Sequence, residues 1–89
     1  MDKKILLVDD AAFMRMMIKD TLTKNGYTNI IEAADGEQAV EQFKNEKPYL
    51  IIMDITMPNK TGIEALREIK QIDSAAKIVM CSAMGQESM

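Results

Sequence analysis

Short apolar runs alternate along the chain with segments of helical periodicity. The first run, Ile5–Val8, is continuous, as in a strand that is covered on both faces, and it ends abruptly at Asp9 and Asp10. The later runs comprise Ile30 and Ile31 with Ala33, then 49–53, then Ile78–Cys81. Strands that alternate with helices are typical of βαβ units, so the pattern predicts an α/β protein with a parallel sheet.

Segment 12–25 is predicted to form an amphipathic helix, because the polar positions Arg15, Lys19 and Thr23 recur at a spacing of four. The apolar residues, several of them methionines, occupy the other faces. We interpret these methionines first as core or contact surface and only second as a stripe that binds a partner. Gly26 follows where a left-handed cap is expected.

Two further helices are predicted. One has its apolar positions on one face around residues 39–43 and ends before Pro48, because the proline ring disfavours helical geometry in the preceding residue. The other has Ile63, Leu66 and Ile69 along one face. No internal repeat, low-complexity segment or linker is visible, so we expect residues 1–89 to form a single domain.

Composition and charge exclude several function classes. The chain is 47% hydrophobic and 4% aromatic, which indicates an aliphatic core. It carries 14 acidic and 11 basic residues without a basic run, so we expect no nucleic-acid and no membrane partner. No apolar stretch approaches the roughly 20 residues that cross a bilayer, and no signal peptide is visible, so a cytoplasmic protein is expected. Cys81 lies in an apolar run and is predicted to be a buried core residue in a reducing compartment.

Three carboxylates and one hydroxyl follow the apolar runs. Asp9 and Asp10 follow the first run, Asp54 the third and Ser82 the fourth. These groups converge if the first and third strands are neighbours, because the carboxyl ends of parallel strands share one edge. A hard divalent cation would relieve the repulsion between the carboxylates, and oxygen-only ligands favour Mg²⁺ or Mn²⁺ over Zn²⁺. Asp54 is then a plausible nucleophile in phosphoryl transfer.

A simpler interpretation stands beside this one. Acids at strand ends are often solvated turn residues or helix caps, and Asp10 can also serve the start of the first helix. Ser82, taken alone, reads as a cap. An acid pair after one strand and a third acid after another nevertheless favour a shared pocket.

The motifs together resemble a two-component receiver domain, specifically a chemotaxis response regulator of the CheY type. The resemblance rests on residues 8–10, 11–15, 53–58, Gly62 and 81–86, which occur in the expected order and spacing. It implies a flavodoxin-like, doubly wound parallel sheet with five strands in the order 2-1-3-4-5. In this chain the sheet is expected to be truncated after the fourth strand.

The resemblance implies a role for each site residue. Asp54 would be the phosphoacceptor, and Asp10 and Asp54 would ligate Mg²⁺ together with the backbone carbonyl of Thr56. Asp9 would act through water or assist the metal, and Ser82 would be the switch hydroxyl. A CheA-type chemotaxis histidine kinase would donate the phosphoryl group, and the phosphorylated form would engage the flagellar motor switch protein. Such a protein phosphorylates and dephosphorylates itself and is not a conventional enzyme.

The chain departs from the family at its end, because it stops at Met89 and its last lysine is Lys77, before the fourth strand. The family's phosphate-binding lysine and fifth strand would be missing. We therefore expect a homodimer or larger self-assembly, and metal binding that survives better than phosphorylation. The alternative function is a receiver fragment that self-associates and binds metal without signalling. A phosphatase of the haloacid dehalogenase kind is disfavoured, because Thr56 stands where that chemistry needs a second acid.

Overall fold

Four strands and three helices alternate in the computed structural model, which describes residues 3–55 and 60–81. In chain order they are β1 (Ile5–Val8), α1 (Ala12–Lys24), β2 (Ile30–Ala33), α2 (Gly36–Glu46), β3 (Leu50–Asp54), α3 (Gly62–Ile72) and β4 (Ile78–Cys81). The strands are parallel and lie in the order β2-β1-β3-β4. The predicted doubly wound, flavodoxin-like sheet is thereby confirmed, with β1 and β3 as neighbours.

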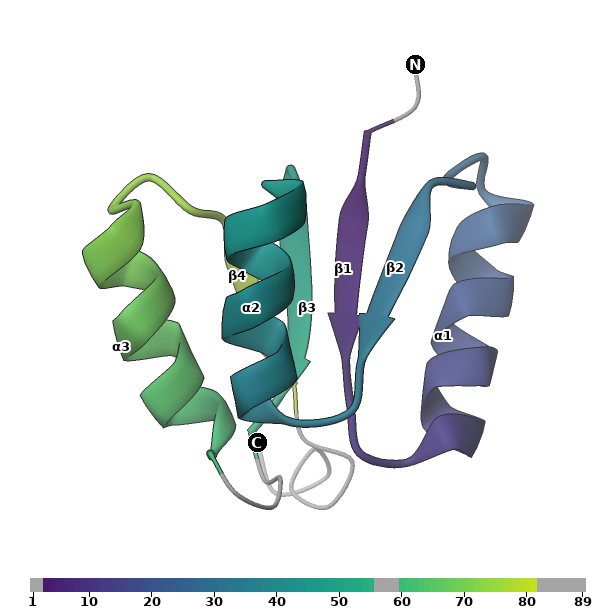
Figure 1. Ribbon diagram of the computed structural model, residues 1–89. Coiled ribbons are helices and arrows are strands. Elements are labelled where there is room, and N and C mark those ends of the chain that lie inside the picture. The colour runs from purple at the N-terminus through teal and green to yellow at the C-terminus, as the bar shows by residue number, and fades with distance from the viewer. Residues whose placement is uncertain (1–2, 56–59, 82–89) are drawn as a thin grey trace.

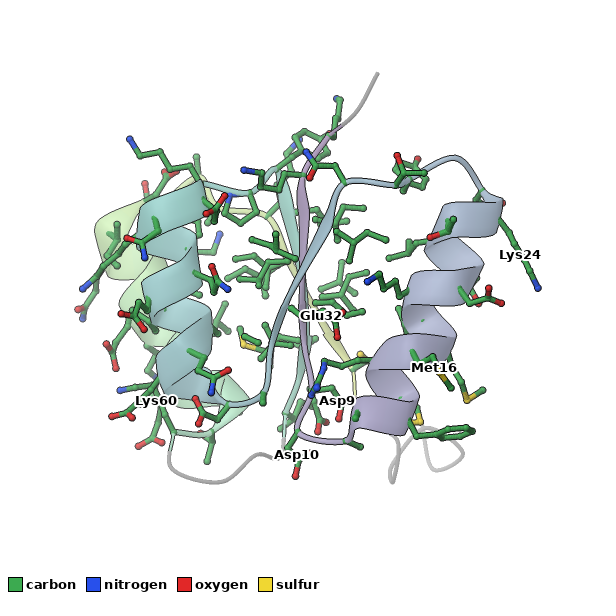
Figure 2. All side chains as sticks on the ribbon, turned by 45° about the vertical axis from the view of Figure 1, so that its right-hand side comes forward. Asp9, Asp10, Met16, Lys24, Glu32 and Lys60 are labelled. Atoms are coloured by element: carbon green, nitrogen blue, oxygen red, sulfur yellow. The ribbon has the colours of Figure 1, made fainter. Side chains whose placement is uncertain are left out.

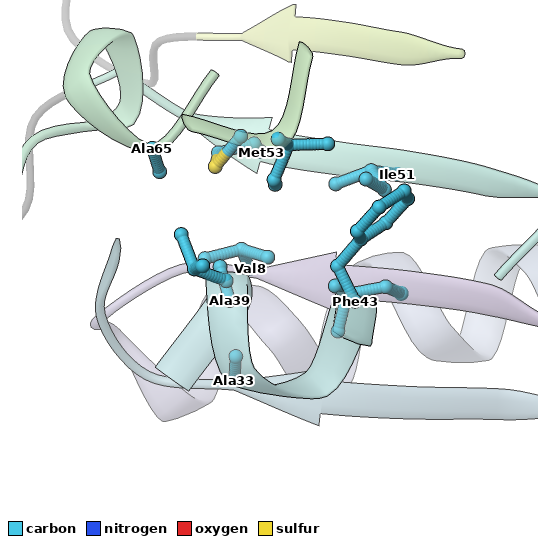
Figure 3. Packing of buried hydrophobic residues seen from close by; sticks show 10 residues of the cluster. Val8, Ala33, Ala39, Phe43, Ile51, Met53 and Ala65 are labelled. Carbon is cyan, nitrogen blue, oxygen red and sulfur yellow. The ribbon is translucent and has the colours of Figure 1, made fainter. Parts of the chain in front are cut away.

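The helices lie on both faces of the sheet, with α2 and α3 on one face and α1 on the other (Figures 1 and 2). The main core lies between the sheet and the pair α2 and α3 (Figure 3). Its buried residues are Leu6, Val8, Ala33, Ala39, Val40, Phe43, Ile51, Met53, Ala65 and Ile69. Alternate residues of β1 point the other way, and Leu7 is fully buried on the α1 face.

Polar caps fix the ends of α2 and α3. The Asp35 side chain accepts a hydrogen bond from the backbone N–H of Gln38, and Lys47 ends α2 in the left-handed conformation directly before Pro48. Thr61 and Glu64 form a capping box at the start of α3. The end of α2 before Pro48 agrees with the sequence prediction.

The first helix differs from its prediction. It has no buried residue, and Met16 is 60% exposed on the side away from the sheet (Figure 2). The polar positions Arg15 and Lys19 instead both bind Glu32 on β2, with side chains that are 17% and 48% exposed. The interpretation as core is therefore wrong for Met16 and for Met17, which is 48% exposed, whereas Met14 is half-buried. The interpretation of these methionines as a contact surface stays a prediction.

The two ends of β3 also differ slightly from the prediction. Tyr49 lies outside the strand, where the Lys3 and Lys77 ammonium groups lie 4.0 and 4.4 Å from the centre of its ring. Asp54 is the last residue of β3, because its backbone continues the pairing as far as Cys81. The strand thus carries the candidate phosphoacceptor itself rather than ending before it.

Strand β4 is an edge of the sheet within residues 3–55 and 60–81. Register places Val79 beside Ile52, and Ile52 beside Leu7, so all three share the face that α1 partly covers. Val79 is 51% exposed. Among the helices described, none is long and apolar enough to cross a bilayer.

Candidate functional site

Three carboxylates meet at the carboxyl edge of the sheet. Asp9 and Asp10 follow β1, and Asp54 ends the adjacent strand β3. One carboxylate oxygen from each residue lies within 4.8 Å of the other two. Figure 2 shows Asp9 and Asp10 at this edge, beside the start of α1. The convergence follows from the parallel pairing of β1 with β3.

Asp9 is the most enclosed of the three acids, with an exposed fraction of 6%. Its backbone N–H donates to the carbonyl of Ala33 at 3.1 Å, which extends the pairing with β2. One carboxylate oxygen accepts a hydrogen bond from the backbone N–H of Ala11 at 2.9 Å. Asp9, rather than Asp10, therefore shapes the turn into α1, whose N-cap residue Ala11 has no side-chain cap. Asp10 is exposed.

A guanidinium group joins this turn to the sheet. One terminal nitrogen of Arg15 donates to the backbone carbonyl of Asp9, while its Nε donates to Glu32 Oε1 at 2.9 Å. Lys19 Nζ lies 3.2 Å from the second oxygen of Glu32. The pKa of Glu32 is lowered, chiefly by the hydrogen bond from Arg15, with Lys19 adding to the effect. The network links α1, β1 and β2 at the edge that carries the acids.

Asp54 lies against the start of α3. The backbone N–H of Gly62 donates to the carbonyl of Ile55 at 2.8 Å. A Cβ atom added to Gly62 would lie 2.2 Å from the backbone oxygen of Asp54, which is far inside van der Waals contact. Only a glycine allows the helix to approach the acid-bearing strand so closely.

Cys81 lies beside the acids and is only partly buried, so the prediction of a buried core residue is wrong. It pairs in register with Asp54. Burial raises the pKa of its thiol, and the charges of Asp54 and then Asp9 raise it further. Burial and the neighbouring carboxylates therefore both disfavour the thiolate form of Cys81.

The donor set fits a hard divalent cation. Asp9, Asp10 and Asp54 supply oxygen atoms alone, which is the chemistry that Mg²⁺ and Mn²⁺ prefer. The two other residues predicted for the site, Thr56 and Ser82, lie outside the described residues.

Sequence reasoning missed Arg15 and Glu32 as neighbours of the acids. The spacing of Arg15 and Lys19 by four residues places them on one helix face, and Glu32 is the only acid in the run from Ile30 to Ala33. An acid in an otherwise apolar strand is a usable signal, since a partly buried carboxylate needs a cationic partner. The sequence alone does not reveal which helix face supplies it.

Comparison with known proteins gives a match along almost the whole chain. The model of the response regulator receiver domain family matches residues 5–89. The chain is 64% identical over 89 residues to the chemotaxis protein CheY of Bacillus subtilis, covering all of this chain and 74% of that relative. It is 57% identical to the chemotaxis protein CheY of Thermotoga maritima, with the same two coverages of 100% and 74%.

Solved structures agree with this match. The fold superposes with a TM-score of 0.88 and 39% identity on a chain of the CheX–CheY–BeF₃–Mg²⁺ complex from Borrelia burgdorferi, covering 97% of this chain and 66% of that one. For the response regulator TrrA of Thermotoga maritima, in complex with Mg²⁺ and BeF, the TM-score is 0.85 at 34% identity, and the match covers 98% of this chain and 76% of that one.

Proposed function

The chain belongs to the response regulator receiver domain family, with CheY-type chemotaxis relatives, and on that premise we propose that Asp54 accepts a phosphoryl group in a Mg²⁺-dependent reaction. The observation that carries the proposal is the meeting of three carboxylates at the carboxyl ends of β1 and β3. Residues 1–89 would act as one receiver unit. The family match favours this function over that of a metal-binding assembly fragment.

Each acid has a separate task in this proposal. Asp10 and Asp54, with the backbone carbonyl of Thr56, would hold Mg²⁺, or Mn²⁺ in its place, and Asp9 would assist. The bound ion would neutralise carboxylate charge and charge on the phosphoryl oxygens. A carboxylate oxygen of Asp54 forms the new bond to phosphorus as the bond from phosphorus to the donor breaks. The Ser82 hydroxyl would sense the phosphorylated state.

Partners follow from the same premise. The two relatives reported above are chemotaxis proteins, so we propose a CheA-type histidine kinase as donor and the flagellar motor switch protein as target, both reached in the cytoplasm. A net charge of −3 without a basic run supports the absence of nucleic-acid and membrane partners.

The test is phosphorylation by a small phosphodonor, followed by intact mass. We expect the mass of one phosphoryl group to be added when Mg²⁺ is present, and none to be added when the metal is chelated. Asp54→Asn should abolish the addition. Asp20→Asn is the matched control, because it removes the same charge from an exposed residue that pairs with Lys24 on α1. Addition that persists in Asp54→Asn at the wild-type rate refutes the assignment of the phosphoacceptor.

Self-association is a separate proposal and concerns the edge strand β4. Its backbone edge and the 51% exposed Val79 form a surface on which the same strand of a second copy can pair. Sedimentation should show a dimer or larger species at tens of micromolar. Val79→Lys should shift the protein towards monomer, and a wild-type protein that sediments as a folded monomer refutes the proposal.

A further inference from the structure

We propose that Arg15 is a positioning residue for the metal site, acting through the turn that carries Asp9 and Asp10. This inference rests on the proposed function, because it concerns the cation site of that proposal. Arg15 would not touch the metal. It would fix the direction in which Asp10 leaves the sheet.

The attachment of α1 gives polar contacts room for such a role. The helix has no side-chain N-cap and no fully buried residue, and its Met14 and Ile18 are half-buried. Two polar contacts add to this packing at the first turn. One is the hydrogen bond from Ala11 to the Asp9 carboxylate, and the other is the bridge that Arg15 makes.

The shape of the guanidinium group explains why this bridge can orient a ligand. Its Nε is held by Glu32 on β2, and a terminal nitrogen of the same planar group reaches the backbone carbonyl of Asp9. That carbonyl belongs to the peptide group that leads into Asp10. Fixing the plane of this peptide restricts the direction of the Asp10 side chain. The Arg15 side chain is 17% exposed, so water competes only weakly for its hydrogen bonds.

Charge and position make opposite predictions for Arg15. As a cation near the carboxylates, Arg15 repels Mg²⁺, so a purely electrostatic role predicts that its removal tightens metal binding. If Arg15 instead positions Asp10, its removal should weaken Mg²⁺ binding, because outer-shell partners of a metal site typically contribute about tenfold or more in affinity. The sign of the change therefore separates the two roles.

The experiment is a titration of the folded chain with Mg²⁺, followed by the amide chemical shifts of the turn. Variants Arg15→Met and Arg15→Lys are compared with the wild type and with Lys19→Met. Lys19→Met is the matched control, because it removes a cation from the same Glu32 without a contact to Asp9. Urea unfolding of each variant identifies the conditions under which the protein is folded.

We expect Mg²⁺ binding about tenfold weaker in Arg15→Met. Arg15→Lys should also bind more weakly, because an ammonium group keeps the charge but cannot span both acceptors, and Lys19→Met should stay within twofold of the wild type. Hydrogen exchange of the Ala11 amide without metal should be faster in both Arg15 variants. Unchanged or tighter metal binding, or unchanged exchange at Ala11, overturns the inference. Arg15→Lys decides alone if Arg15→Met does not fold. A wild-type chain that fails to bind Mg²⁺ instead overturns the proposed metal site, and the inference with it.

Discussion

Replacing Gly62 by alanine tests whether the close approach of α3 positions Asp54. The added Cβ would lie 2.2 Å from the backbone oxygen of Asp54, 2.9 Å from the Cα of Ile55 and 2.9 Å from the Cε of Met80. The methionine end can move aside, but the other two atoms belong to the backbone at the end of β3. A carbon atom normally stays roughly 3.3 Å or more from a carbonyl oxygen, so helix or strand must shift by about 1 Å.

The magnitude follows from two opposing terms. Forcing an extra methyl group into a filled space typically costs about 1–3 kcal/mol. Alanine offsets up to about 1 kcal/mol of this through its better helix propensity. We expect a net loss of about 1–2 kcal/mol in the free energy of unfolding, and a Tm that falls by roughly 4–8 °C for each kcal/mol in a domain of this size. Phosphorylation should slow by about tenfold to a hundredfold, because a shift of about 1 Å in a reacting group has effects of that order.

Gly26→Ala is the control that separates stability from position. Gly26 has a φ of +95°, and a Cβ added to it would meet nothing within 4 Å. Its substitution should cost about 1–2 kcal/mol through backbone strain alone. Both variants should therefore unfold at similar urea concentrations, while only Gly62→Ala loses phosphorylation rate when both are fully folded. Equal rates in the two variants would refute the claim that Gly62 positions Asp54.

Three further outcomes follow from the geometry. Glu32→Gln should lower the free energy of unfolding at pH 7. The difference from the wild type should vanish as the pH falls through the lowered pKa of Glu32, because the carboxylate that Arg15 binds is then protonated. A difference in urea unfolding that persists in acid contradicts this prediction. Cys81 should be alkylated more slowly than a free thiol at neutral pH. Its alkylation should be faster in Asp54→Asn, since the Asp54 charge helps to raise the pKa of the thiol. Equal alkylation rates in the wild type and Asp54→Asn, measured by mass, would argue against this prediction. Thr61→Ala should lose about 1 kcal/mol in urea unfolding with the capping box of α3, and an unchanged midpoint would exclude that contribution.

The fold could be predicted from the sequence because each strand is a short apolar run, and β1 is buried on both faces. Continuous apolar runs separated by helical periodicity leave few arrangements, and Ile5–Val8 and Ile78–Cys81 have the predicted bounds. The meeting of Asp9 with Asp54 then depends only on β1 and β3 being neighbours. The ends of strands near polar groups were harder to predict from the sequence. Tyr49, for example, lies outside β3 and contacts two lysines.

The orientation of α1 could not be predicted for a physical reason. Periodicity assigns charged residues to solvent, which holds when the alternative is an apolar core. On the α1 face, Glu32 provides a carboxylate for Arg15 and Lys19, so these polar positions lie beside the sheet. Phe13 and Met16 are then left 64% and 60% exposed. Pattern alone does not identify such a partner, because the pairing joins two different elements.

The three acids of the site are held by different forces, and this difference determines how each should respond to change. Asp54 continues β3, whose Met53 is fully buried, so the core and the contact with Gly62 fix its backbone. Asp9 is fixed by pairing with β2 and by its hydrogen bond from Ala11. Asp10 is exposed, and the turn that carries it is joined to α1 by the hydrogen bonds of Ala11 and Arg15. A core substitution should therefore lower the stability of the whole domain, whereas loss of a polar contact should act selectively on the direction of Asp10. Under the proposed function, the direction of Asp10 would therefore depend on the contacts of α1 as well as on the core.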